Sequence, residues 1–448
     1  MISQLFNIYI IIVCVIILYN LQRGFILTLI SRIIIPSSVR FSLGSISISI
    51  YDVFILTLLV SIIIHHKKYI KKTPNLISKY LYIYILSTFV LIFLSSGYVP
   101  YNYQLFSFLK NFLFQTVLYI LIGFWVLKNA DIRNVIHLTA IVSLLAGIYG
   151  ILTYILRVNI YIDSLNNVYN VKNDFSFFME EIRGGLLGRV YGTMEHPLSW
   201  GQYWNLYLCV IYIFKSKINN WLWLALVCIG LINIILCGSR TAIVTQLVFV
   251  VFILLSYGIR KIFYILPLIY LFIMLIICSI PKNYKNSGVI DYIESGIFFW
   301  DTSKSERAGI VGSSTEMRLS QLRRTIDIME KNPVGGVGYN YQYYSMDSGR
   351  VIDAELYGLE SVVFKILVEQ GLVGLVIFFY TLYVLYRFAI ESIHNIRIKC
   401  LVKGFFCTFI VSILFTGIQG ASYIFFVIFL FFINIKNDTE NHSLLLVK

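Results

Sequence analysis

Long runs of apolar residues recur from the start of the chain to its end, and this feature restricts the fold more than any other. A helix that crosses a bilayer needs about 20 mainly apolar residues. Only 13% of the 448 residues are Asp, Glu, Lys or Arg, whereas soluble proteins contain roughly 25%. The runs are continuous rather than alternating, which argues against a transmembrane β-barrel. The sequence therefore predicts an all-α integral membrane protein and excludes a cytosolic enzyme, a disordered chain and a secreted disulfide scaffold.

About twelve of these runs are interpreted as membrane-spanning helices. They cover residues 5–20, 49–65, 80–98, 106–127, 135–157, 195–214, 220–237, 241–258, 262–280, 371–387, 401–418 and 421–435. The first run lacks a basic stretch before it and a cleavage site after it, which indicates an uncleaved span. Residues 21–48 are apolar in part but contain Arg32, and we assign them to the outer interface. An additional span there would raise the number to thirteen.

The positive charges indicate how the chain is oriented in the membrane. The net charge of +14 arises mainly from short loops beside apolar runs, such as residues 65–72. This distribution is typical of cytoplasmic loops and does not point to a nucleic acid partner. The lysines of this loop place the end of the second span in the cytoplasm. Alternation of the spans then predicts a multi-pass protein of a bacterial inner (cytoplasmic) membrane with both termini in the cytoplasm.

The chain divides into three parts on this basis. Residues 1–280 carry the first nine spans and an outer loop at 158–194, and residues 371–448 carry the last three spans and a short cytoplasmic tail. Between them, residues 281–370 form a large extracytoplasmic loop that ends in an amphipathic helix. A loop of this length between helices is usually functional or a small domain.

Short helices and a glycine turn are predicted within the large loop. Residues 314–331 place apolar side chains at helical spacing, and the Asn-Pro pair that follows ends this helix. The glycines of 335–338 favour a structural turn over a phosphate cradle, because no strand–helix unit surrounds them. A second, amphipathic helix at 360–370 leads into the tenth span at Gly371.

Neither a metal nor another cofactor is predicted. The seven cysteines all lie in or beside apolar runs, so they indicate no disulfide framework and no metal knuckle. The outer loops contain no metal-ligand spacing and no nucleotide loop followed by Lys and Ser or Thr.

Three arginines are candidates for binding an anion at the outer face. Arg189 lies at the outer mouth of the sixth span, Arg240 lies in the turn between the seventh and eighth spans, and Arg318 lies in the large loop. An arginine at a membrane edge is commonly an anchor whose head reaches the interface. Several guanidinium groups at one surface can instead grip a diphosphate through bidentate bonds. Arg240 also opens a helix, where free N–H groups favour anions.

Two titratable residues are candidates for a general base. His196 precedes a proline at a helix start, where a structural cap is the more common role. Glu360 begins the helix after the large loop, where a carboxylate either stabilises the helix N-terminus or takes a proton from a sugar hydroxyl. Glu195, Asp353 and Glu355 are further outer carboxylates.

Four segments together resemble the O-antigen polymerase and ligase superfamily, which contains Wzy-type polymerases and WaaL-type ligases. Residues 189–197 resemble its R-x-x-G-x-x-x-H-P segment, and 238–242 resemble its S-R-T/G-A turn. Residues 318–338 resemble its R-x-x-x-W…P-x-x-G-x-G stretch, with Leu322 where an aromatic residue is common. Residues 360–375 resemble its H-N-x-x-L…E-x-G-x-x-G-L segment. The four occur in the family order.

The resemblance implies a metal-independent membrane glycosyltransferase that acts on undecaprenyl-diphosphate-linked glycans at the outer face. Arg189 and Arg240 would hold the diphosphate leaving group, with Arg318 as a further candidate. The expected product is O-antigen, capsular or exopolysaccharide, and the expected partners are a chain-length regulator and a flippase.

One departure from the family pattern favours a polymerase. Ligases carry His and Asn where this chain has Glu360 and Ser361. An O-antigen ligase remains the alternative within the same class. A flippase or transporter of lipid-linked glycans is the alternative from another class, but it would show paired repeats and charges near the bilayer midplane.

Overall fold

The computed structural model describes most of the chain as helices. It describes residues 2–36, 39–43, 46–69, 75–128, 130–169, 182–183, 186–258, 315–347, 356, 359, 361–391, 393–417 and 420–445. The first helices are α1 (Ile2–Tyr19), α2 (Leu21–Ile34), α3 (Ile50–Tyr69), α4 (Asn75–Leu94), α5 (Tyr101–Ser107), the π-helix η1 (Phe108–Leu118), α6 (Tyr119–Leu127), α7 (Ile132–Leu156) and α8 (Ile160–Tyr169). The later helices are α10 (Pro197–Ile213), the short η2 (Lys215–Lys217), α11 (Asn220–Leu236), α12 (Arg240–Ser256), α16 (Thr315–Lys331), α17 (Tyr341–Asp347), α18 (Val362–Glu391), α19 (Ile396–Phe415) and α20 (Gly420–Leu445).

The only strands among the described residues form two small antiparallel hairpins. The first pairs β1 (Arg40–Leu43) with β2 (Ile46–Ser49), and the second pairs β3 (Ile182–Arg183) with β4 (Leu186–Leu187). The fold is therefore that of an all-α protein, as the apolar runs predict.

Several helices have the length and composition of membrane spans. Four described helices are long and apolar enough to cross a bilayer: Tyr101–Leu127, Ile132–Leu156, Val362–Glu391 and Ile396–Phe415. Shorter apolar helices lie in six of the other predicted spans, and the predicted sixth span, 195–214, contains the helix α10. The predicted ninth span, 262–280, lies outside the described residues, and so does half of the large loop. The number of twelve spans therefore stays a prediction.

The first three helices correct one expectation. Residues 21–34 do not lie at the interface but form the buried helix α2, which contacts α1, α3, α6 and α7. The α1 carbonyls of Ile17 and Leu18 accept hydrogen bonds from Ser61 and His65 of α3, at 2.7 and 3.1 Å. The α1 and α3 helices therefore run parallel, and α2 runs back between them.

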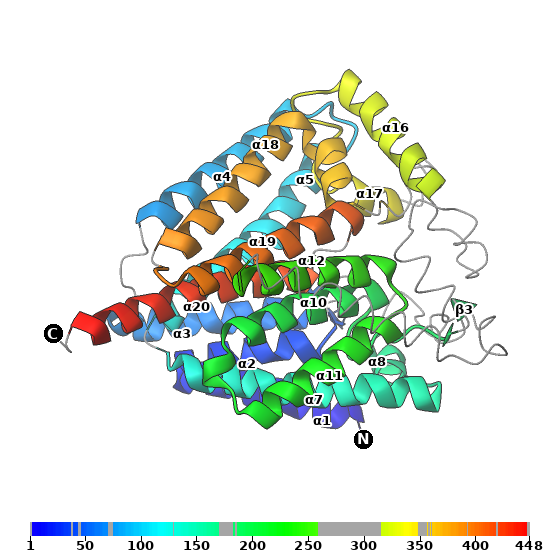
Figure 1. The fold of residues 1–448 in the computed structure, drawn as a ribbon. Helices are drawn as coiled ribbons and strands as arrows, with labels where there is room; N and C mark the ends of the chain where they lie inside the picture. The colour runs from blue at the N-terminus through cyan, green and yellow to red at the C-terminus, as the bar shows by residue number, and fades with distance from the viewer. Residues whose placement is uncertain are drawn as a thin grey trace.

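This reversal changes the expected position of the N-terminus. Figure 1 shows the N-terminus toward the end of the bundle that carries β3, whereas the C-terminus lies at the opposite end. The expectation that both termini lie on one side does not fit this arrangement. The termini lie at opposite ends because α2 adds a pass through the bundle, although this helix is only 14 residues long and contains the charged residue Arg32.

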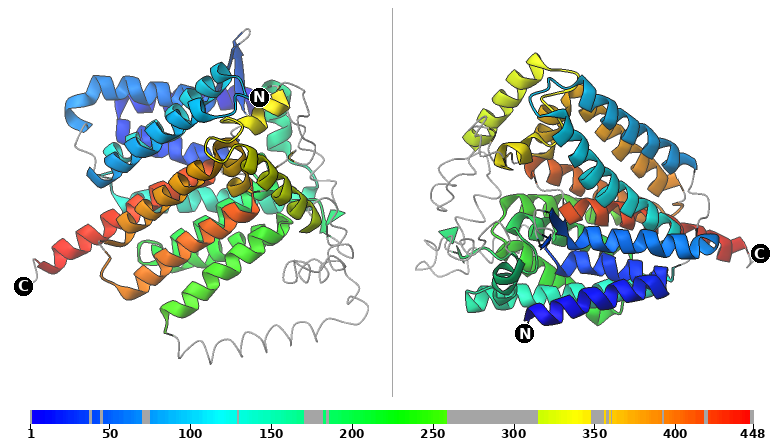
Figure 2. Two further views of the ribbon diagram at one scale, coloured as in Figure 1. Left: turned by 90° about the horizontal axis from the view of Figure 1, so that it is seen from above. Right: turned by 180° about the vertical axis from the view of Figure 1, so that it is seen from behind.

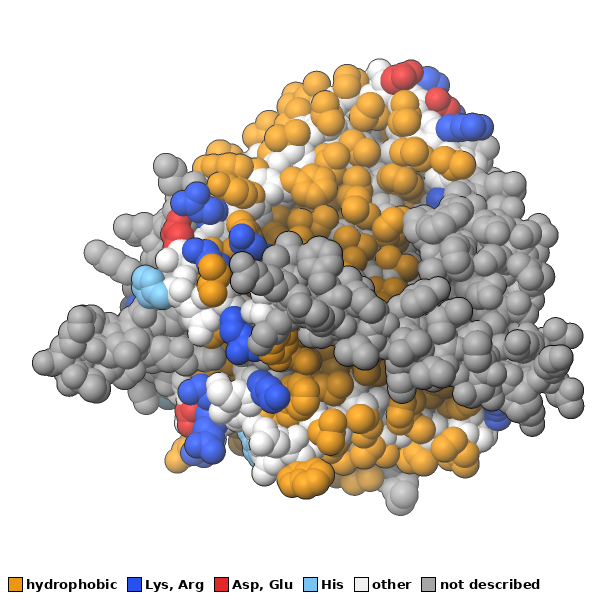
Figure 3. All heavy atoms as spheres, viewed as in Figure 1, with side chains coloured by type: hydrophobic (Ala, Val, Ile, Leu, Met, Phe, Trp, Pro, Cys, Tyr) orange, Lys and Arg blue, Asp and Glu red, His pale blue; other side chains and the backbone are white. Residues whose placement is uncertain are grey.

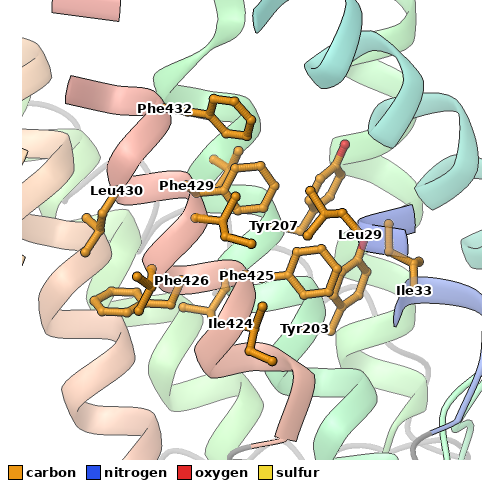
Figure 4. Packing of buried hydrophobic residues seen from close by; sticks show 14 of the residues in the cluster. Leu29, Ile33, Tyr203, Tyr207, Ile424, Phe425, Phe426, Phe429, Leu430 and Phe432 are labelled. Carbon is orange, nitrogen blue, oxygen red and sulfur yellow. The ribbon is translucent and has the colours of Figure 1, made fainter. Parts of the chain in front are cut away.

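The helix α10 forms the centre of the molecule, and almost all of its residues are buried. Tyr203 and Tyr207 pack against Phe425 and Phe429 of α20, with ring centroids 5.6 and 6.4 Å apart. Figure 4 shows Leu29 of α2 on the other side of these tyrosines. Aromatic pairs of this kind add about 0.5–1.5 kcal/mol each beyond the burial of their area.

Basic residues gather at one end of the bundle. The described basic residues of the predicted cytoplasmic loops all lie there, near the end of α6 or the start of α7, near the end of α10, or between α18 and α19. They are Lys128, Arg133, Lys215, Lys217, Arg387, Arg397, Lys399 and Lys403. Figure 3 shows Lys and Arg side chains gathered at the left of the molecule, the side on which the C-terminus lies in Figure 1, with hydrophobic side chains beside them. The segments with Arg189, Arg240 and Arg318 lie toward the other end.

The described part of the large loop confirms the predicted helix and turn. The helix α16 begins one residue after the predicted start and ends at Lys331 as predicted. The helix α18 is kinked at Gly371, where φ is 67°. The amphipathic first part of α18 ends at this kink, and the apolar part follows it. Figures 1 and 2 show α16 and α17 at one edge of the bundle, beside α18.

Candidate active site

Two of the predicted arginine segments meet at one turn. The backbone N–H of Val190 donates to the carbonyl of Leu236 at 2.9 Å, and Arg189 Nε donates to the carbonyl of Cys237 at 3.2 Å. Gly238 has a φ of 63°, and a Cβ at this position would lie 3.0 Å from Cγ of Arg189. A glycine is therefore required for Arg189 to pack on the turn. Arg189 is 4% exposed, so its position is well defined.

Arg240 is the first residue of α12 and lies three residues after Cys237 in the same turn. Ser239 caps this helix, because its hydroxyl accepts from the N–H of Ala242 at 3.4 Å. The expectation of free N–H groups at this helix start therefore holds only in part. Cys237 is buried in this turn, and its Sγ donates to the carbonyl of Ile234 at 3.0 Å.

His196 forms the cap of α10, as the more common role of such a residue predicts. Its Nδ1 accepts a hydrogen bond from the N–H of Leu198 at 3.0 Å. A neutral imidazole whose Nδ1 accepts carries its proton on Nε2. The ring then offers a donor rather than an acceptor on its other side, which disfavours His196 as a general base.

A polar pocket lies beside the Arg240 turn, between the starts of α10 and α12 and the end of α19. Among the described residues, its lining contains hydroxyl and amide side chains and no charged one; these lining residues are Leu198, Gln202, Asn205, Ser239, Thr241, Ala242, Thr245, Ser412 and Thr416. Ser239 and Thr241 of this lining flank Arg240 in the chain. The pocket therefore adjoins the turn on which both arginine segments meet.

Two amide side chains in this pocket are deeply buried. Gln202 is 3% exposed and Asn205 is 1% exposed. The Nδ2 group of Asn205 donates to the hydroxyl of Thr245 at 2.7 Å. Within the part of the chain that the structure describes, Oδ1 of Asn205 and both amide atoms of Gln202 have no hydrogen-bond partner. Buried polar atoms without partners are rare in folded proteins.

Arg318 reaches the same end of the bundle from the large loop. Its guanidinium carbon lies 5.6 Å from the centroid of the Phe415 ring, at the last residue of α19. The next residue, Thr416, lines the polar pocket. The helix α16 thus brings Arg318 next to the end of α19, which forms the third wall of the pocket.

Glu360 lies outside the described residues, and so do Asp353 and Glu355. The residues that directly follow Glu360 are bound to the end of α19. The N–H of Val362 donates to the carbonyl of Thr416 at 3.2 Å, and the hydroxyl of Ser361 lies 3.5 Å from the carbonyl of Ile413. The start of α18 is thereby attached to the end of α19, beside the pocket.

The glycine turn at 335–338 is structural, as predicted. The N–H groups of Val337 and Gly338 donate to the carbonyls of Val368 and Glu369, at 2.8 and 3.3 Å. A Cβ at Gly335 would lie 2.4 Å from the carbonyl oxygen of Leu94. These N–H groups are therefore occupied by protein carbonyls, and the turn holds α4 against α18.

The pocket amides were not among the predicted site residues. A signal for them exists in the sequence, because Ser199, Gln202 and Asn205 recur every three residues in an otherwise apolar run. Residues at this spacing share one face of a helix. The contribution of Ser412 and Thr416 has no comparable signal, since it depends on how α19 packs.

Comparison with known proteins identifies one matching family. A family model described as O-antigen ligase matches residues 224–379, a segment that includes Arg240 and Arg318. Arg189 and His196 precede the matched segment. No curated protein matches the chain.

Proposed function

Residues 224–379 identify the chain as a relative of the O-antigen polymerases and ligases, and from this we propose that it polymerises undecaprenyl-diphosphate-linked repeat units at the outer face of the cytoplasmic membrane. The observation that carries the proposal is the packing of Arg189 against the turn that contains Arg240. Two guanidinium-bearing segments, 51 positions apart in the chain, thereby reach one end of the bundle.

The proposed reaction is a glycosyl transfer without a metal. A hydroxyl of the acceptor repeat unit attacks the anomeric carbon of the donor, and the bond from that carbon to the diphosphate oxygen breaks. The donor is already activated, so the protein must stabilise the charge of the leaving group and orient the acceptor. Arg189 and Arg240 stabilise the diphosphate, with Arg318 as a further cation. The acceptor proton passes to Glu360 or to the diphosphate itself.

The residues after the large loop favour a polymerase over a ligase. Glu360 and Ser361 stand where the ligases of the family carry His and Asn. Ligation to a second acceptor is the other candidate, and the description of the matching family favours it. Both reactions use the same donor and the same leaving group.

The product that accumulates in a deletion strain distinguishes these reactions. Without a polymerase, single repeat units should still be exported and, in a Gram-negative host, still be joined to lipid A core. Without a ligase, long chains would instead remain on the carrier lipid. A flippase defect would leave single units in the cytoplasm. Long carrier-bound polymer in the deletion strain would contradict our proposal.

We further propose that the end of the bundle with the polar pocket faces outward. The basic residues at the other end support this orientation, because such residues favour the cytoplasmic side. The N-terminus of α1 then lies outside and the C-terminus inside. Cysteines introduced at Ser3, Ser313 and Ser348, in a variant without reactive cysteines, should react with an impermeant thiol reagent in intact cells. Cysteines at Lys71 and Lys399 should not react, and the reverse pattern would overturn the orientation.

A further inference from the structure

The pocket beside the Arg240 turn contains polar groups that the proposed diphosphate does not use. The diphosphate is anionic and requires cations, whereas the described residues that line this pocket include no charged side chain. Among the described residues, the amide of Gln202 lacks a partner for its donor and for its acceptor, and Asn205 Oδ1 lacks a donor. Each side chain is more than nine-tenths buried. The pocket therefore suits an uncharged group that both donates and accepts hydrogen bonds.

Sugar hydroxyls have this chemistry. A hydroxyl donates one hydrogen bond and accepts others, and it matches an amide that presents N–H and C=O together. The carrier lipid lacks it, because an isoprenoid tail has no hydrogen-bonding groups and would leave the amides unsatisfied. The pocket has a cavity volume of about 10 Å³, which is roughly the space that one water molecule needs. This is room for a single hydroxyl group and not for a sugar ring.

We infer that the Gln202–Asn205 pocket is a sugar subsite that receives one hydroxyl group of the glycan whose diphosphate lies at Arg240. This inference rests on the proposed function, since it assigns the subsite to the lipid-linked donor. Ser239 and Thr241 flank Arg240 in the chain and also line the pocket, so the pocket adjoins the turn from which the arginine extends. The subsite selects donors by the position of one hydroxyl.

A matched pair of substitutions tests the subsite. Gln202→Leu removes the amide from the pocket without changing the size of the side chain greatly. Gln246→Leu is the control, because Gln246 is also buried, its Oε1 also lacks a partner among the described residues, and it does not line the pocket. Both variants should match the wild type in abundance and in unfolding temperature without substrate.

The kinetic experiment uses the purified full-length protein and lipid-linked repeat units extracted from the same strain. Gln202→Leu should raise KM for the donor roughly tenfold, as expected for a lost hydrogen bond to an uncharged group. Gln246→Leu should behave like the wild type. Gln202→Asn, which keeps an amide at this position on a shorter side chain, should recover part of the loss.

A panel of monodeoxy donors provides a sharper test. The wild type and Gln246→Leu should discriminate against one deoxy position, and Gln202→Leu should lose that discrimination. If Gln202→Leu keeps the wild-type KM or the wild-type discrimination, the pocket holds only a water molecule and the inference is wrong.

Failure of the proposed function gives a different result. If the wild type forms no longer glycan from these donors, polymerisation is wrong, and donor binding still tests the pocket. The lipid-linked unit should then raise the unfolding temperature of the wild type and of Gln246→Leu more than that of Gln202→Leu. Equal shifts in all three proteins would overturn the subsite as well.

Discussion

Two polar clusters lie at the same end of the bundle, and they differ in how completely their hydrogen bonds are made. The first surrounds Asp52 at the start of α3; we name it the Asp52 cluster, and it comprises Arg32, Ser49, Asp52, Lys110 and Gln115. The carboxylate of Asp52 accepts from the N–H of Ser49 at 2.9 Å and from Nε2 of Gln115 at 2.6 Å. Lys110 lies 3.9 Å from the same carboxylate. The second cluster is the Gln202–Asn205 pocket, whose amides have few partners among the described residues.

Arg32 shows how the Asp52 cluster accommodates a buried cation. Its guanidinium lies 4.4 Å from the ring centroid of Tyr51 and 4.3 Å from that of Tyr119. Such cation–π contacts contribute about 2 kcal/mol when they are desolvated. Its Nη2 also lies 3.5 Å from the carbonyl of Gln115 in the π-helix. The contacts of the Asp52 cluster therefore link α2, α3 and η1. Fewer hydrogen bonds link the helices around the Gln202–Asn205 pocket, and its amide groups can bind a ligand.

The largest effect is expected for Asp52→Ala, which tests whether the Asp52 cluster is structural. Removing the carboxylate leaves the backbone N–H of Ser49 and Nε2 of Gln115 without their acceptor. It also removes the negative charge of the cluster that contains the buried cation Arg32. We expect a loss of about 3 kcal/mol of unfolding free energy and little folded protein in the membrane. Thermal unfolding in detergent, followed with protein abundance, measures this. Asp52→Asn retains an acceptor oxygen and should lose clearly less.

A stable, abundant Asp52→Ala protein without activity would reverse the comparison. The Asp52 cluster would then belong to the reaction rather than to the framework.

Glu360→Gln tests the other side of the comparison, because it should reduce activity without reducing stability. A general base contributes about a hundredfold or more to the rate, whereas a carboxylate at a helix start contributes only about 0.3–1 kcal/mol to stability. We expect at least a hundredfold loss of polymer at normal protein abundance, with partial activity in Glu360→Asp. Polymer length and protein level in the same cells provide the measurement. A Gln variant that polymerises like the wild type would eliminate Glu360 as the base.

Lysine substitutions at Arg189 and Arg240 should have the next largest effect. A lysine keeps the charge but cannot form the two parallel bonds of a guanidinium. We expect Arg→Lys to lose nearly as much activity as Arg→Ala, roughly 30-fold, with protein abundance near that of the wild type. Full polymer from both lysine variants would leave only the role of a membrane anchor. Lys215→Ala, at the opposite end of the bundle, is the control for a general loss of positive charge.

The sequence predicts the helical fold well because apolar length and charge position are local properties. The end of the helix at Lys331 and the break at Gly371 were both predictable from Pro and Gly signals. The helix α2 was missed because hydropathy scores Arg32 as exposed, whereas the rings of Tyr51 and Tyr119, distant in sequence, bury it. The meeting of Arg189 with the Arg240 turn depends on the same kind of distant contact. The motifs name these residues, but only the fold brings them together.

The most direct test of the comparison is the replacement of glutamine by leucine in both clusters, and its effect in the Gln202–Asn205 pocket is the smallest that we expect. Gln115→Leu removes a donor to the Asp52 carboxylate at 2.6 Å and should cost about 1.5–3 kcal/mol of unfolding free energy. Gln202→Leu removes an amide whose atoms have no partner among the described residues. Replacing such an amide by an apolar group removes the desolvation penalty of the amide. The unfolding free energy of the Gln202→Leu variant should therefore stay within about 0.5 kcal/mol of that of the wild type, or increase. Denaturant unfolding in the same detergent, without substrate, compares the two variants directly. Equal losses would mean that Gln202 is as fully bonded as Gln115, and the difference between the two clusters would disappear.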